Sequence, residues 1–83
     1  METDLFCIFD ELGEKASPPF AAENDEVAVR QYRTLLDEVP AFARKDFKLY
    51  KVGFFNYANM KIDSHTPIEV DTIRRFEAEL NHE

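Results

Sequence analysis

Basic and aromatic residues alternate in the middle of the chain, between Arg44 and Tyr57. This pattern is typical of proteins that bind single-stranded nucleic acid, because cations follow the phosphates while flat rings stack on the bases. The candidate phosphate contacts are Arg44, Lys45, Lys48 and Lys51, and the candidate stacking residues are Tyr50, Phe54 and Tyr57. Arg30 and Arg33 would extend the basic face from a neighbouring helix. If about five phosphates are engaged, the logarithm of the binding constant should fall with that of the salt concentration at a slope of about −3.5.

The charge of the chain is unevenly distributed. The 83 residues carry a formal net charge of −7 at pH 7. Residues 1–26 contribute −7, residues 27–62 contribute +4 and residues 63–83 contribute −4. The middle is therefore basic within an acidic whole, and local potential matters more for phosphate binding than net charge. The same bases would also suit the solvated faces of a helix and a strand.

Catalytic and metal chemistry find little support in the residue types. Two glycines leave no glycine-rich phosphate loop, and two histidines with one cysteine cannot supply a structural zinc site. Cys7 lies in an apolar run, where burial makes a thiol inert. Asp63 and His65 are two candidate metal ligands, which are too few to form a metal site. We therefore expect neither an enzyme nor a metal or cofactor site.

Length and composition indicate one folded domain, residues 1–83. Hydrophobic residues make up 45% of the chain, too many for a disordered protein. No apolar run approaches the roughly 20 residues that span a membrane, and the acidic N-terminus is not typical of a signal peptide. A single cysteine excludes an internal disulfide and suits a reducing cytoplasm.

Local patterns predict the order of the elements. The apolar run 5–9 predicts a buried strand, and Pro18 and Pro19 limit any further pairing to residues 20–22. Asn24 is the expected N-cap of a helix over 25–39, which Pro40 ends. The apolar residues of 46–55 change parity at Tyr50 and Val52, which predicts either a bulge or a two-sided strand. A hairpin turn at 56–59 then leads into a short strand over 60–62.

The C-terminal part offers two interpretations. Thr66-Pro67-Ile68-Glu69 has the pattern of a capping box with proline at the first helical position. An extended 67–70 with Asp71 as the cap is the alternative. Either way, the expected fold class is α+β: a small antiparallel sheet in ββαββα order, covered by one central helix, with a C-terminal helix. Such a small core also favours a homodimer.

Several short motifs together resemble a known phage family. They are Phe9-Asp10, Pro18-Pro19-Phe20-x-Ala22-x-Asn24, Ala28-x-Arg30-x-Tyr32 and Asp46-Phe47-x-Leu49-Tyr50-x-Val52-Gly53-x-Phe55. Their order and spacing, from about Leu5 to Ile62, resemble the small nonstructural protein of gokushoviruses, single-stranded DNA phages of the Microviridae. The chain departs from the family pattern where Ala43-Arg44-Lys45 replaces a usual His-Pro and its acidic neighbour, and where residues 56–60 lack the usual acidic turn ending in Thr-Gly.

The resemblance implies a nonstructural protein of the infected bacterium's cytoplasm, absent from the virion. It implies DNA binding, preferentially to single strands, in viral DNA replication or in the switch to single-strand synthesis and packaging. The alternative is a protein-interaction module. Its acidic surfaces would bind a phage replication or scaffold protein, or would mimic DNA to inhibit a host protein. No membrane partner is expected.

Overall fold

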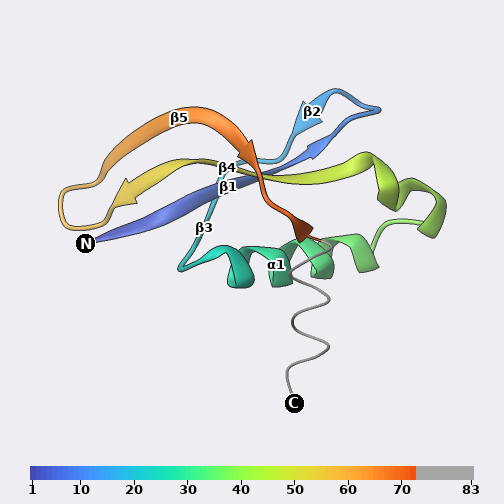
Figure 1. Ribbon diagram of the computed structural model, residues 1–83, viewed down its shortest axis with the longest axis horizontal. Coiled ribbons are helices and arrows are strands. Elements are labelled where there is room, and N and C mark those ends of the chain that lie inside the picture. Colours follow the sequence, from blue (N-terminus) through green and yellow to red (C-terminus); the bar gives the residue numbers. More distant parts are fainter. Residues whose placement is uncertain (73–83) are drawn as a thin grey trace, which may run out of the picture.

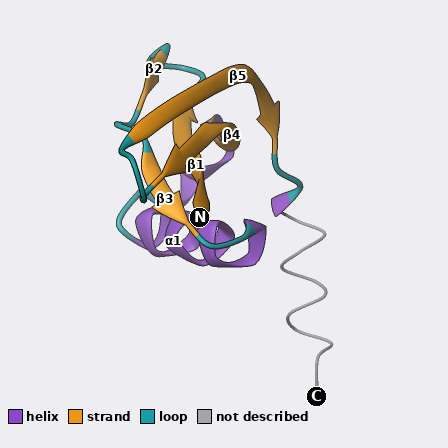
Figure 2. Ribbon diagram, turned by 90° about the vertical axis from the view of Figure 1, so that its left-hand side faces the viewer, coloured by secondary structure: helices purple, strands orange, loops and turns teal. Residues whose placement is uncertain are grey.

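The computed structural model describes residues 1–72, in which an antiparallel sheet curls into half a barrel above one α-helix (Figures 1 and 2). The strands are β1 (Glu2–Asp10), β2 (Lys15–Ala16), β3 (Phe20–Ala22), β4 (Phe47–Asn56) and β5 (Lys61–Glu69). β1 pairs with β2 and β3 along one edge and with β4 along the other, and β4 pairs with β5. Long β1 and β4 therefore form the centre of the sheet.

β1 divides its side chains between two environments. Phe6 and Ile8 face the helix and are buried, whereas Cys7 and Phe9 face the other way and are only half-buried. This alternation follows from the period of two along a strand. We call the side of the sheet that carries Cys7 and Phe9 the open face. The strand expected over 5–9 is confirmed, and the prolines leave Phe20–Ala22 as the paired part of the next segment, as expected.

Helix α1 (Asp25–Asp37) covers the opposite side of the sheet (Figure 2). The side-chain oxygen of Asn24 accepts a hydrogen bond from the Val27 amide at 2.9 Å, so the expected N-cap is confirmed. Ala28, Val29 and Tyr32 are buried against the sheet. The helix ends two residues earlier than expected, and a 3-10 helix, η1 (Ala41–Asp46), connects it to β4.

A bulge interrupts the pairing of β4 at Val52. Leu5 of β1 pairs with Gly53, and the next residue, Phe6, pairs with Lys51, so Val52 has no partner on β1. The pairing of β4 with β5 is also irregular between Lys51 and Gly53. The first of the two expectations for this segment, a bulge, is confirmed.

The expected ββαββα order with a C-terminal helix is wrong. Three strands precede α1 instead of two, because Lys15–Ala16 pairs with the end of β1. Thr66–Glu69 belongs to β5 and does not begin a helix. Tyr50 and Lys51 pair with Glu69 and Ile68, and the Val70 amide donates to the Leu49 carbonyl at 2.9 Å. Sheet pairing and the burial of Val70 thus override the local capping-box pattern. The part of the expected helix from residue 73 onwards lies outside the described residues.

Candidate nucleic-acid interface

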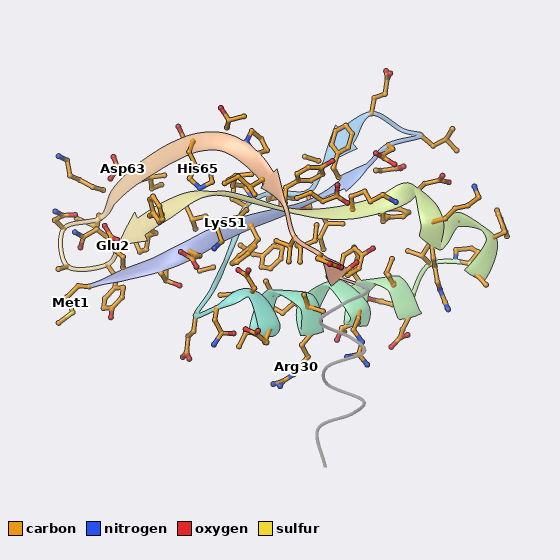
Figure 3. The ribbon with its side chains drawn as sticks, viewed as in Figure 1. Met1, Glu2, Arg30, Lys51, Asp63 and His65 are labelled. Atoms are coloured by element: carbon orange, nitrogen blue, oxygen red, sulfur yellow. The ribbon has the colours of Figure 1, made fainter. Side chains whose placement is uncertain are left out.

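The nine residues expected to form one binding surface lie in several separate parts of the structure; Figure 3 labels two of them, Arg30 and Lys51. Arg44, Lys45 and Lys48 lie around the junction of η1 and β4, and Tyr50 lies on the open face. Phe54 and Tyr57 lie at the opposite end of the sheet, near the β4–β5 turn. Lys51 lies between the sheet and α1, and Arg30 and Arg33 lie on α1 itself. The structure brings together a smaller set, centred on Lys48 and Tyr50.

Lys51 is engaged in internal ion pairs. Its Nζ lies 3.4 Å from Asp4 Oδ2 and 3.2 Å from Asp25 Oδ1, and its side chain is 27% exposed. The ammonium also lies 5.8 Å from the centre of the Phe6 ring. Burial alone would lower the pKa of Lys51, but hydrogen bonds and charge from Asp25 and Asp4 raise it above its ordinary value. This side chain joins β1, β4 and the first turn of α1.

The basic residues at the η1 end of the molecule make hydrogen bonds and ion pairs within the protein. Arg44 Nε donates to the Val39 carbonyl at 2.9 Å, just after the end of α1. Lys48 Nζ donates to the Lys45 carbonyl at 2.9 Å and lies 3.9 Å from Glu11. Lys45 is paired with Asp46 at 3.4 Å, but its side chain is 79% exposed. Arg44 and Lys45 are exposed and Lys48 is half-buried, so all three cations of this cluster remain within reach of a ligand.

A cavity of about 550 Å³ opens between this cluster and the end of β5. Tyr32, Phe47 and Val70 supply apolar lining. Tyr32 donates its hydroxyl proton to the Phe47 carbonyl at 2.7 Å, and burial raises its pKa. Glu69 and Asp71 line the cavity beside Arg44, Lys45 and Lys48, so its charge is mixed and does not single out an anion.

The open face of the sheet carries an apolar hollow of about 280 Å³. The open-face hollow is lined by Cys7, Phe9, Ala16, Tyr50, Val52 and Pro67. The rings of Phe9 and Tyr50 meet edge to face, with centroids 6.4 Å apart and planes at 85°. Burial raises the pKa of the Cys7 thiol, which keeps it protonated at neutral pH. The lining thus offers flat rings and aliphatic groups to a ligand.

Lys48 supplies a cation next to this hollow. It is paired with Phe9 across the β1–β4 ladder, two residues before Tyr50 on the same strand. Residues two apart on a strand share a face, so the Lys48 and Tyr50 side chains leave the sheet on the same side. A phosphate contact beside a stacking surface is the arrangement that single-strand binding requires. Phe9 was missed as a site residue, although the alternation within residues 5–9 places it opposite Phe6 and Ile8.

Phe54 and Tyr57 belong to a different surface at the β4–β5 turn. Tyr57 is 58% exposed, and Phe54 meets the His65 ring edge to face at a centroid distance of 5.5 Å. Met60 and Ile62, 78% and 66% exposed, lie beside them in the chain. This apolar tip is at the end of the sheet away from η1 (Figure 1).

The arginines of α1 do not extend the open face. Arg30 is exposed and points away from the sheet in Figure 3. Arg33 is half-buried on the same helix, which lies on the covered side of the sheet. The expected continuity of these two residues with Lys48 is therefore absent.

Comparison with known proteins gives one informative match. The model of a family described as Phage ORF5 protein matches residues 3–82. No curated protein and no solved structure matches the chain. Within residues 1–72, no helix has the length and apolar character needed to cross a membrane.

Proposed function

The chain belongs to the Phage ORF5 protein family, and from this premise we propose that it is a phage accessory protein that binds single-stranded DNA. The observation that carries the proposal is the open-face hollow, where Phe9 and Tyr50 lie next to Lys48. Stacking on such rings tolerates every base, and a nearby cation neutralises a phosphate. The resemblance to gokushovirus nonstructural proteins supports the same proposal.

The protein would act in the cytoplasm of the infected bacterium, outside the virion. Its roles there would be in genome replication or in the switch to single-strand synthesis and packaging. The arrangement of the basic side chains supports contact with only a few nucleotides. Lys48 is next to the hollow and Lys45 is next to Lys48, whose Nζ donates to the Lys45 carbonyl, so about two phosphates would be engaged and the salt slope would be about −1.4, shallower than −3.5.

Fluorescence anisotropy of a labelled single strand of 20–30 nucleotides tests the proposal. We expect saturable, salt-sensitive binding that a duplex of equal length competes poorly. Tyr50→Ala should weaken this binding by about tenfold or more, since stacking contributes about 1–3 kcal/mol per base. Tyr57→Ala is the matched control, because Tyr57 lies at the far end of the sheet. Absence of binding at low salt, or equal losses in both variants, would contradict the proposal.

The apolar tip supports a second candidate, a protein-interaction module. Tyr57, Met60 and Ile62 are all more than half exposed there, and exposed apolar groups that cluster in this way mark protein interfaces. The partner would be a phage replication or scaffold protein, or a second copy of this chain. Met60→Ser together with Ile62→Thr would then abolish that association without changing affinity for the oligonucleotide.

A further inference from the structure

We propose that the open-face hollow is the seat of one unpaired nucleobase, with Tyr50 as its stacking partner. This inference rests on the proposed function and makes it more specific. It assigns the contact to a single position on the sheet, and it identifies a flipped-out base as the group that enters.

The size and lining of the hollow fit one flat ring system. Its volume of about 280 Å³ lies just below the roughly 300–1,000 Å³ of pockets that hold drug-sized ligands. All six lining side chains are uncharged, and Phe9 supports the Tyr50 ring edge to face. Pro67 of β5 lines the hollow together with Val52 at the bulge of β4. A base in this place would contact Tyr50 and aliphatic groups, and none of the lining side chains among residues 1–72 carries a charge that must be desolvated.

Charge at the rim favours a nucleotide over an apolar protein side chain. The Lys48 side chain leaves the sheet next to the hollow, where its Nζ donates to the Lys45 carbonyl at 2.9 Å and its one charged partner, Glu11, lies 3.9 Å away. An ammonium in this position can meet the phosphate that follows the inserted base, whereas an apolar side chain from a protein would leave it unused. A base stacked within a duplex cannot reach the hollow without unpairing, so this seat selects single strands.

The lining also predicts tolerance of sequence. The polar side-chain atoms that it offers are the Tyr50 hydroxyl and the Cys7 thiol. Base discrimination requires paired donors and acceptors aimed at base edges. Homopolymers of the four bases should therefore differ in affinity by less than about tenfold, because a single hydrogen bond does not provide bidentate readout.

Cys7 allows a direct test in the unmodified protein. It is the single cysteine of the chain and it lines the hollow, so its rate of reaction with a maleimide reports on the seat alone. With an oligothymidine at ten times its Kd, the rate should fall about tenfold, because only the free protein reacts. An abasic strand of the same length and charge, at the same concentration, should leave the rate within about twofold of the free protein, since it has phosphates but no base.

Replacing either of two alanines by phenylalanine provides an independent test. Ala16→Phe would fill the hollow from exposed β2, whereas Ala21→Phe adds the same side chain at an exposed position of β3 that is outside the lining. We expect Ala16→Phe to weaken oligothymidine binding at least as much as Tyr50→Ala, and Ala21→Phe to leave it unchanged.

The outcomes separate this inference from the proposed function. If the oligonucleotide binds by anisotropy while Cys7 reacts at its free rate, the base lies elsewhere and the inference is overturned, but single-strand binding stands. If the abasic strand protects Cys7 as well as oligothymidine does, backbone contact rather than base insertion occludes the hollow, and the inference fails again. If no strand binds at all, both proposals fail together.

Discussion

Two lysines on β4, three residues apart, should affect different properties when each is replaced by methionine: Lys51→Met should lower stability, and Lys48→Met should weaken DNA binding. Lys51→Met removes an ammonium that lies 3.4 Å from Asp4 and 3.2 Å from Asp25, in a side chain only 27% exposed. Exposed ion pairs contribute about 0.2–1 kcal/mol each, and Lys51 makes two ion pairs with a half-buried side chain. Since methionine retains contact with the Phe6 ring, we expect a loss of about 1.5 kcal/mol in the free energy of unfolding. That loss corresponds to a fall in Tm of roughly 6–12 °C for a domain of this size.

Lys48→Met should leave stability nearly unchanged and weaken DNA binding. Lys48 contacts the Lys45 carbonyl and lies 3.9 Å from Glu11 near the surface, so the change in the free energy of unfolding should stay within about 0.5 kcal/mol. Thermal unfolding by circular dichroism and anisotropy at 15 °C, on the same preparations, measure the two effects. Our reasoning would be refuted if Lys51→Met weakened oligonucleotide binding while its Tm stayed at the wild-type value. That result would place Lys51 on the phosphates rather than between the sheet and α1.

Further predictions concern the elements that hold this arrangement. The pKa of Lys51 is raised above 10.5 in the folded chain, so its stabilisation is complete below pH 10.5 and is lost as the pH rises through the folded-state pKa. The Tm difference between wild type and Lys51→Met should therefore be constant from pH 7 to about pH 10 and shrink above it. Gly53→Ala would place a Cβ against the Asp63 carbonyl oxygen and should cost about 2–3 kcal/mol by forcing β4 and β5 apart, measured by urea denaturation. Asn24→Ala removes the hydrogen bond to the Val27 amide and should cost about 1 kcal/mol; an unchanged urea midpoint would contradict this role of the cap.

Features that depend on neighbouring residues alone were predictable from the sequence. The Asn24 cap needs only the first turn of α1, and Pro18 and Pro19 restrict pairing through their own missing amides. The segment 66–69 shows the limit of such reasoning. Its capping-box pattern is a local signal for a helix, but Ile68 and Glu69 find partners on β4, which lies more than 15 residues earlier in the chain. The local pattern left a helix and an extended segment over 67–70 as alternatives, and pairing with β4 decided for the extended conformation through Glu69.

The candidate site was harder to predict because it depends on the register of β4 against β1. Regular alternation from Lys48 onwards would place Tyr50 and Phe54 on one face, where both rings could stack on nucleobases. The bulge at Val52 inserts one extra residue into β4, so that Phe54 pairs with Asp4. Asp4 lies on the same side of the sheet as Lys51, and Phe54 therefore faces that side and not the side of Tyr50. One unpaired residue thus separates Phe54 from Tyr50, while Val52 itself lines the open-face hollow. An aromatic stripe long enough for several bases becomes a seat for one base beside one cation, which is why we expect both a small footprint and a shallow dependence on salt.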